Sequence, residues 1–165
     1  MAYKIRNSFA GSQPIADTST VKNHPVGTIV QGDDPTYGGG EFIYLKGVAS
    51  TVVGSIVTYV ASTGATVLSL TSGVVNGGAP LAVAMSANVA SQYGWYQIAG
   101  DAVIKVDPAG TTKVYLSATS GRVMQTSVAG RQVIGARWIT ATTVTSTTST
   151  AIATINRPVQ QGAIT

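Results

Sequence analysis

The chain has 165 residues, of which 10% are charged and 44% are hydrophobic, and its formal net charge at pH 7 is +4. This length fits one domain that buries its own core. The absence of cysteine excludes disulfides, thiolate metal ligands and cysteine nucleophiles. The basic residues are dispersed along the chain, whereas nucleic-acid binders usually cluster them on one face, so we expect no direct contact with nucleic acid.

Residues 1–25 are expected to form an extended N-terminal arm. Gly11, Pro14 and Pro25 interrupt the segment, and its Ser, Thr and Asn residues favour local turns over helix. Arms of this kind commonly lie across a neighbouring subunit, and we expect the β fold to survive removal of residues 1–24. No apolar signal-peptide core follows the start of the chain, which favours synthesis in a cytoplasm without secretion.

From residue 26 onward the signals are those of strands, namely short runs of β-branched and aromatic residues bounded by Gly, Pro, Asn or Asp. We expect about ten short strands, which is typical of an all-β sandwich or of a jelly-roll or barrel-like domain. In chain order, the expected strands are 27–31, 41–47, 52–60, 66–70, 81–87, 92–99, 102–106, 112–118, 122–126, 133–140 and 143–155.

Three turns are expected to join neighbouring strands into hairpins. Ser62-Thr63-Gly64 lies between the third and fourth strands, and Thr119-Ser120-Gly121 lies between the eighth and ninth. Gly100-Asp101 separates two strongly alternating segments and predicts the clearest hairpin of the chain.

Two segments leave alternatives open. Residues 80–91 would tolerate a short helix, although a strand followed by a turn is favoured. The Thr-rich segment 143–155 fits either a strand with a polar outer face or disorder. Asn156-Arg157-Pro158 is expected to end the β domain, which would then span 26–156 and leave a tail at 157–165.

Residues 47–100 carry no charged side chain. They mix β-forming apolar residues with Ser, Thr, Gly, Tyr and Gln, and no window supplies the roughly 20 mainly apolar residues of a spanning helix. We therefore expect no membrane partner. A neutral surface of this extent suits burial against other subunits better than exposure to water, because monomeric proteins usually rely on surface charge for solubility.

The chain has few residues of the kinds that catalysis or metal binding requires. His24 is its only histidine, so no second histidine or cysteine is present to share a metal ion. Asp33-Asp34-Pro35 offers oxygen ligands for Ca²⁺, but turn chemistry explains it more simply. Gly38-Gly39-Gly40-Glu41 lacks the Lys-Ser/Thr of a phosphate-binding loop. We expect no enzyme activity, no cofactor and no metal.

Aromatic residues gather in one short segment that contains Tyr93, Trp95 and Tyr96. Such side chains can stack on sugars or bases, but in a strand they alternate between two faces, so only part of the set can point one way. We expect Trp95, Tyr96 and Trp138 to anchor the core or an oligomer interface.

Three groups of residues carry a family resemblance: Phe42-Ile43-Tyr44-Leu45-Lys46-Gly47-Val48-Ala49-Ser50, Val83-Ala84-Met85-Ser86 with Ser91-Gln92-Tyr93-Gly94-Trp95-Tyr96-Gln97-Ile98, and Tyr115-Leu116-Ser117-Ala118 with Gly121-Arg122-Val123. They resemble small structural proteins of tailed bacteriophages, in particular head decoration proteins, also called cement proteins. The resemblance covers about residues 26–140, and no catalytic motif anchors it.

The resemblance implies a β-rich structural protein, commonly a homotrimer, that sits on the exterior of the phage capsid in the virion after synthesis in the host cytoplasm. Its partners would be the major capsid protein and further copies of itself. The residues expected to contact the capsid or a neighbour are Tyr3, Lys4, Ile5, Arg6 and Phe9 of the arm, and those expected to form rim ion pairs with capsid carboxylates are Arg122, Arg131 and Arg137.

Two other functions are open from the sequence. One is a phage tail or baseplate β-protein that recognises a host glycan through exposed aromatic residues. The other is a β-barrel nucleic-acid-binding module, which would need a basic groove interleaved with aromatics, whereas residues 47–100 hold several aromatics and no basic residue.

Overall fold

The computed structural model describes residues 4–5, 12–69, 77–107, 113–139 and 150–162. These residues form an all-β protein, which confirms the predicted fold class, and none of them is helical. All twelve strands belong to one large antiparallel sheet, and within the described ranges this sheet does not close into a barrel.

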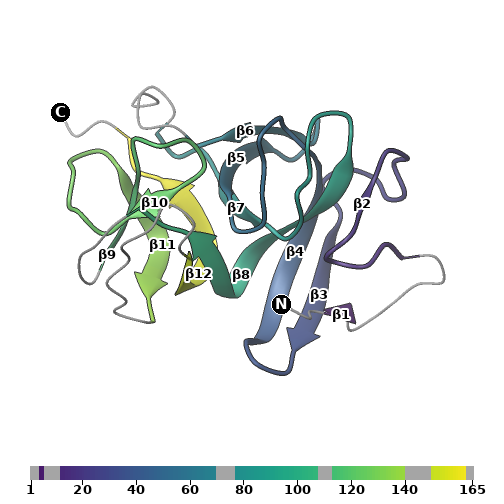
Figure 1. Cartoon of the computed structure of the whole chain (residues 1–165), viewed down its shortest axis with the longest axis horizontal. Coiled ribbons are helices and arrows are strands. Elements are labelled where there is room, and N and C mark those ends of the chain that lie inside the picture. The colour runs from purple at the N-terminus through teal and green to yellow at the C-terminus, as the bar shows by residue number, and fades with distance from the viewer. Residues whose placement is uncertain (1–3, 6–11, 70–76, 108–112, 140–149, 163–165) are drawn as a thin grey trace.

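The β3–β4 and β5–β6 connections are short, and most of the other connections are longer. Their order in the sheet is β1-β3-β4-β8-β12-β11-β9-β10, while β2 and β7 also pair with β8, and β5 pairs with both β6 and β7 (Figure 1). Their bounds are β1 Lys4–Ile5, β2 Thr18–Ser19, β3 Ile29–Asp34, β4 Gly38–Lys46, β5 Ile56–Val60, β6 Ala65–Leu68, β7 Leu81–Ala84, β8 Tyr93–Lys105, β9 Lys113–Leu116, β10 Val123–Met124, β11 Gln132–Trp138 and β12 Thr150–Gln160.

Strand β8 is continuous, so the hairpin predicted at Gly100-Asp101 is wrong. A two-residue type I′ turn needs a positive φ at both central residues, and here only Gly100 has one, at 99°. The two halves of β8 also have other partners, because β4 pairs with its first half and β12 with its second. Gly100 instead lets β8 pass close to β4, since a Cβ there would lie 2.5 Å from the Gly39 carbonyl oxygen.

The centre of the sheet is buried on both faces. In β4, Phe42 and Tyr44 point into one cluster with Trp95, while Ile43 and Leu45 point into another. Strands β5 and β7 supply Val57, Ala82 and Ala84 to the second cluster. Burial on both faces explains why these strands read as nearly unbroken apolar runs rather than as an alternation. A third and larger cluster lies between β5, β7, the second half of β8 and β9 to β12.

The described part of the expected arm packs against the chain's own core. Ile15 is 2% exposed and joins the cluster of Phe42 and Trp95. The Trp95 indole Nε1 donates to the Gln13 carbonyl oxygen at 2.9 Å, and the Tyr44 hydroxyl donates to Gln13 Oε1 at 2.8 Å. Removal of residues 1–24 would therefore uncover this cluster and destabilise the fold, contrary to the expectation from the sequence.

His24 belongs to the same packing. Its Nε2 accepts a hydrogen bond from the Gln13 backbone N–H at 3.1 Å, and its ring lies 5.1 Å from that of Tyr44 and 5.2 Å from that of Trp95. These contacts give the only histidine of the chain a structural role in closing the N-terminal segment onto the core.

The other predictions for single elements agree with the structure at two hairpins and differ from it at the end of β12. The hairpins at Ser62–Gly64 and Thr119–Gly121 are confirmed by the β5–β6 and β9–β10 pairings. The segment 80–91 contains strand β7 and no helix. The Thr-rich segment 143–149 lies outside the described residues. Strand β12 continues past Asn156-Arg157-Pro158 to Gln160, so that tripeptide does not end the strand as predicted.

Candidate functional site

The β5–β6 hairpin presents an uncharged outer face. Across this hairpin Thr58 pairs with Val67, and Val60 pairs with Ala65. Val60 is 53% exposed and Val67 is 58% exposed, whereas the alternate residue Val57 is fully buried. The period of two turns Thr66 of β6 inward and Val67 outward, whereas the side of β5 that carries Val60 is buried at Ile56 and becomes exposed toward the turn. The hairpin itself contains no charged residue.

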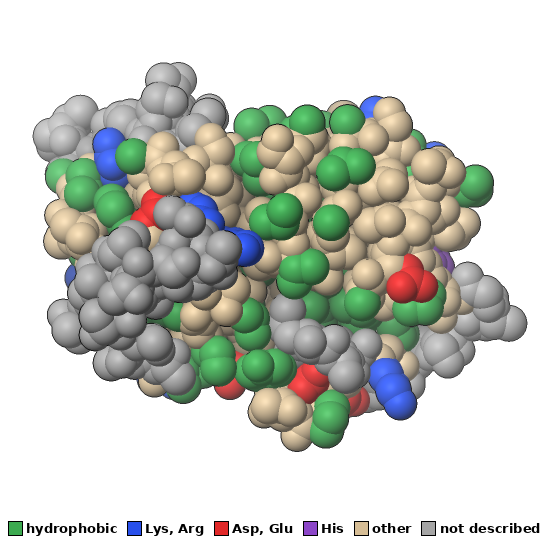
Figure 2. All heavy atoms as spheres, viewed as in Figure 1, with side chains coloured by type: hydrophobic (Ala, Val, Ile, Leu, Met, Phe, Trp, Pro, Cys, Tyr) green, Lys and Arg blue, Asp and Glu red, His purple; other side chains and the backbone are tan. Residues whose placement is uncertain are grey.

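Further exposed valines come from the same uncharged segment. Val52 and Val53, just before β5, and Val89, after β7, are each more than a third exposed. Figure 2 shows the region over β5 to β7 covered by apolar and uncharged polar side chains. We call Val52, Val53, Val60, Val67 and Val89 the neutral surface. Scattered single apolar residues are normal on a protein, but this group coincides with the stretch that lacks charge.

Only two of the five arm residues predicted to make contacts are described. Lys4 is exposed on β1, opposite Asp33 in the register with β3. Ile5 is half-buried against the Phe42 cluster. The other three, Tyr3, Arg6 and Phe9, lie outside the described residues.

The three predicted rim arginines differ in their surroundings. Arg122 has an internal partner, because its Nη1 lies 2.9 Å from Asp107 Oδ1 and also donates to the Val106 carbonyl oxygen at 3.1 Å. Arg131 is half-buried in the loop before β11. Arg137 is exposed on β11 and stands directly opposite Lys113 of β9.

Arg137 and Lys113 form a pair of like charges. Neither has an ion-pair partner among the described residues. Like charges directly opposite each other on adjacent strands are destabilising. A carboxylate from another molecule would relieve this repulsion, so Arg137 is the best placed of the three arginines for an intermolecular ion pair.

Asp107 makes an internal polar cluster with Arg122 and Ser117. Burial raises the pKa of Asp107, but hydrogen bonds from Ser117, Thr119 and Arg122, together with the charge of Arg122, outweigh burial and lower the pKa below its ordinary value of 3.8. The cluster fastens the β9–β10 hairpin to the end of β8, where Val106 also bridges to Val123.

Replacing Asp107 by asparagine is expected to lower the free energy of unfolding at pH 7 by roughly 1–2 kcal/mol, because charge-assisted hydrogen bonds in a partly exposed cluster are lost. The carboxylate stabilises the fold above its unfolded-state pKa, and this contribution disappears as the pH falls through the lower folded-state pKa. Urea unfolding of both proteins at pH 7 and pH 3 measures the effect. The difference should shrink at pH 3, and a difference that does not depend on pH would contradict the assignment.

The predicted aromatic anchors divide between core and surface. Trp95 and Tyr96 are fully buried, on opposite faces of β8. Burial raises the pKa of Tyr96 to about 12, although hydrogen bonds with Thr66, Asn88 and Thr51 oppose the shift. Trp138 is half-buried on β11, where its Nε1 donates to the Lys113 carbonyl oxygen at 3.0 Å. Neither Trp95 nor Tyr96 is available to stack on a sugar or a base.

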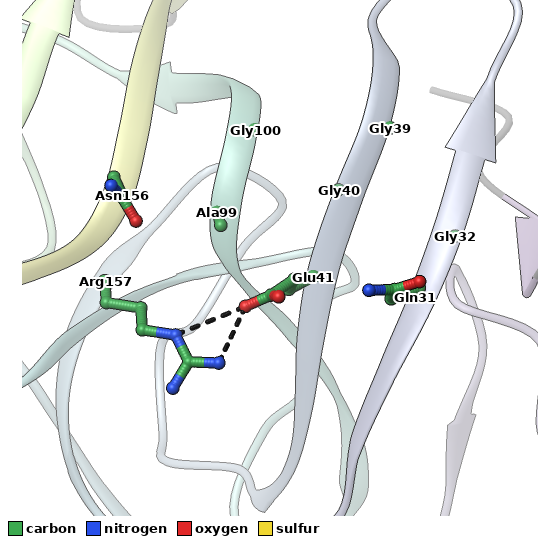
Figure 3. A pocket seen from close by; sticks show the side chains of 9 residues that line it. All are labelled: Gln31, Gly32, Gly39, Gly40, Glu41, Ala99, Gly100, Asn156 and Arg157. Carbon is green, nitrogen blue, oxygen red and sulfur yellow. Dashed lines mark hydrogen bonds and ion pairs between the residues drawn. The ribbon is translucent and has the colours of Figure 1, made fainter.

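A polar cleft lies where β8 passes between β4 and β12. Its volume is about 270 Å³, and its lining comes from four adjacent strands (Figure 3). Arg157 spans the cleft, with its Nη2 3.0 Å and its Nε 3.3 Å from Glu41 Oε2. The lining residues are Gln31 and Gly32 of β3, Gly39, Gly40 and Glu41 of β4, Ala99 and Gly100 of β8, and Asn156 and Arg157 of β12.

A bulge in β12 directs Arg157 into this cleft. In the pairing with β11, Ile134 faces Val159 and Ala136 faces Ile155, so one residue of β11 opposes three of β12. Arg157 adopts a φ of 43°, a left-handed conformation that is uncommon for residues other than glycine. Bulges of this kind bend a strand and redirect a side chain.

The sequence predicted an uncharged segment, but it predicted neither which valines of that segment are exposed nor the residues of the cleft. The exposed valines could be assigned only once the β5–β6 register was known. For the cleft, one signal was present: a proline inside a β-forming segment often marks a bulge, and Pro158 follows Arg157 directly.

In the described part of the chain, no group of three or more His, Asp or Glu residues could hold a metal ion. No helix in those residues is long and apolar enough to cross a membrane. Comparison with known proteins finds no matching family model, no matching curated protein and no matching solved structure.

Proposed function

We propose that this protein is a structural component of a phage virion that attaches to the outside of the capsid and cements neighbouring major capsid subunits. The observation that carries the proposal is the neutral surface on and beside the β5–β6 hairpin, because exposed valines in a segment that itself carries no charge are better suited to a protein partner than to water. The resemblance of residues 26–140 to head decoration proteins supports the same assignment.

The fold supplies what a cement protein needs. Its centre is rigid because β4 and β8 are buried on both faces. The hydrogen bond from Trp95 also ties the N-terminal segment to this centre. A rigid body loses little conformational entropy when it binds, so more of the contact energy appears as affinity. Contacts that exist only on the assembled shell favour that shell by mass action.

The contacts at one site need not be strong. A specific interface typically buries about 1,600 Å² in total, and apolar burial contributes about 25 cal/mol per Å² before the costs of association. A capsid presents the same site many times, and a subunit or oligomer that touches several capsid proteins gains through multivalency. In this proposal the neutral surface supplies the apolar contact, and Arg137 of β11 with Lys113 of β9 supplies a separate charged contact.

Further copies of the chain are the second proposed partner. A homotrimer placed at a symmetry axis of the capsid would hide part of the neutral surface and repeat each capsid contact three times, as the resemblance implies. Stacking of a glycan or a base on Trp95 or Tyr96, on which the other two functions relied, fits less well, because both side chains are buried in the core.

Co-sedimentation with phage heads tests the proposal. The purified protein is mixed with expanded heads of the phage that encodes it, prepared without the protein, and in parallel with unexpanded procapsids. We expect saturable binding to expanded heads, weaker binding to procapsids, and a higher temperature for DNA release from decorated heads. Absence of saturable binding to expanded heads would refute the proposed function.

A further inference from the structure

The cleft between β4 and β12 holds hydrogen-bonding groups that the protein does not use. Arg157 and Glu41 bond through Nε, Nη2 and Oε2, so Arg157 Nη1 and Glu41 Oε1 have no partner among the described residues. The side-chain amides of Gln31 and Asn156, both exposed, are also without a partner in the described ranges. Donors and acceptors therefore alternate along the cleft (Figure 3).

The floor of the cleft consists largely of backbone. Gly39, Gly40 and Gly100 contribute no side chain, and Ala99 contributes only a methyl group. Floors of this kind let a ligand approach the main chain closely. The polar side chains therefore stand at the margins, where they can bond a ligand from both sides.

Arg157 is held in a strained conformation, although 62% of its side chain is exposed to solvent. An exposed arginine gains little from a single surface ion pair, and glycine or asparagine would tolerate the left-handed φ at this position better. Strain that the surrounding structure maintains without an evident gain in stability is commonly found at ligand-binding positions. The bulge in β12 and the strain together position the guanidinium over the cleft.

The charges of the cleft select against ions. An anion that approaches Arg157 meets the carboxylate of Glu41, and a cation that approaches Glu41 meets the guanidinium. Neutral hydroxyl groups meet neither obstacle, because one can accept from Arg157 Nη1 and another can donate to Glu41 Oε1 (Figure 3). The amides of Gln31 and Asn156 can bond further hydroxyl groups in the same two ways.

An extended peptide fits this cleft less well than a sugar. Peptides that bind β-sheets usually add a strand to a free edge, where main-chain groups are unpaired. The cleft crosses the sheet instead, and β4 and β8 at its centre are hydrogen-bonded to a neighbour on both sides. The cleft volume of about 270 Å³ lies just below the usual range for small-molecule sites, which suits a single ring.

We propose that this cleft is a saccharide subsite that binds one neutral sugar residue, held by Glu41 and Arg157 with Gln31 and Asn156 at its ends. This role goes beyond attachment to the capsid, since it would give the decorated particle weak contacts with a carbohydrate surface. Repetition over many copies would convert such contacts into useful avidity. The cleft does not include the valines of the neutral surface, so either activity can be lost without the other.

An NMR titration of the isotopically labelled full chain tests the proposal. The probes are the methyl glycosides of glucose, mannose, galactose and N-acetylglucosamine, each raised to tens of millimolar, with N-acetylneuraminic acid and tetra-alanine as the acidic and peptide probes. We expect saturable shifts of the Gly39, Gly40, Gly100 and Asn156 amides with at least one neutral glycoside. Absence of such shifts with all four glycosides, or shifts with only the acidic sugar or the peptide, would overturn the proposal.

Two variants separate binding from folding. Arg157→Gly removes the guanidinium and relieves the left-handed strain, so its thermal midpoint should be unchanged or higher while affinity falls at least tenfold. Glu41→Gln keeps the shape of the side chain and should weaken binding about fivefold. Lys46→Gln serves as the control, because Lys46 is exposed and lies at the opposite end of β4. This variant should bind the glycoside as the wild type does. Undiminished binding by Arg157→Gly would also overturn the proposal.

Head binding distinguishes this proposal from the capsid function. Arg157→Gly should sediment with expanded heads as the wild type does, because the neutral surface is unchanged. Loss of glycoside binding with retained head binding would place the two activities on separate surfaces, as we propose. Equal loss of head binding would contradict the separation.

Discussion

Aspartate at both Val60 and Val67 is expected to abolish attachment to expanded heads while leaving the fold intact. Both side chains point to solvent on the outer face of the β5–β6 hairpin, so two carboxylates there disturb no internal packing. In a closed interface the same carboxylates would be removed from water without partners, and each would weaken binding by several kcal/mol. Together they should reduce affinity for heads by more than about a thousandfold. Co-sedimentation measures the loss, and circular dichroism checks the fold.

A matched control separates position from charge. Val21→Asp with Ile134→Asp introduces the same change in net charge at two exposed residues outside the uncharged segment 47–100. This control should bind heads within a few fold of the wild type. If both double variants lost binding equally, general electrostatic repulsion rather than the neutral surface would explain the result.

Alanine at Gly47 is expected to lower the free energy of unfolding by more than about 3 kcal/mol, because the added methyl group would overlap the backbone of a neighbouring loop. A Cβ at Gly47 would lie 2.1 Å from the Asn88 carbonyl oxygen and 2.3 Å from that of Val89. The loop cannot easily move away, because Asn88 is fully buried and its Nδ2 donates to the Tyr96 hydroxyl at 3.2 Å. Urea unfolding measures the loss.

Gly78→Ala provides the comparison for this prediction. A Cβ at Gly78 would meet nothing within 4 Å, and only its φ of 80° opposes the substitution, so the expected loss is about 1 kcal/mol. Equal losses for the two variants would show that the loop containing Asn88 gives way, and the steric argument for Gly47 would be wrong.

The sequence predicts strands well where apolar and β-branched residues dominate a short segment. The segments now seen as β4, β5, β6, β7 and β11 were each expected within a few residues of their bounds. The errors occur where a local signal competes with long-range pairing. Gly100-Asp101 resembles a turn, but β4 and β12 pair with the two halves of β8 and keep the strand extended. Likewise, Pro158 suggested an end to the domain, yet β11 pairs with β12 on both sides of the bulge.

The candidate sites depend on spatial relations that no local pattern contains. The uncharged segment indicated that a neutral surface exists, but the register of β5 with β6 decides that Val60 and Val67 face outward. The cleft brings together Gln31, Glu41 and Arg157, which are far apart in the sequence and meet only through the strand order. Arg122 was expected to pair with a capsid carboxylate, but in the structure it forms an internal ion pair with Asp107. That pair depends on the folded arrangement of the strands, which composition cannot predict.

Strand β8 contributes Trp95, Tyr96 and Ile104 to the three separate clusters, so one uninterrupted stretch of backbone ties all of them together. A pull applied at either end of the molecule would be transmitted along covalent bonds rather than through side-chain contacts alone. The molecule would therefore resist stretching as one piece, a property that would suit the attachment to a capsid that we propose.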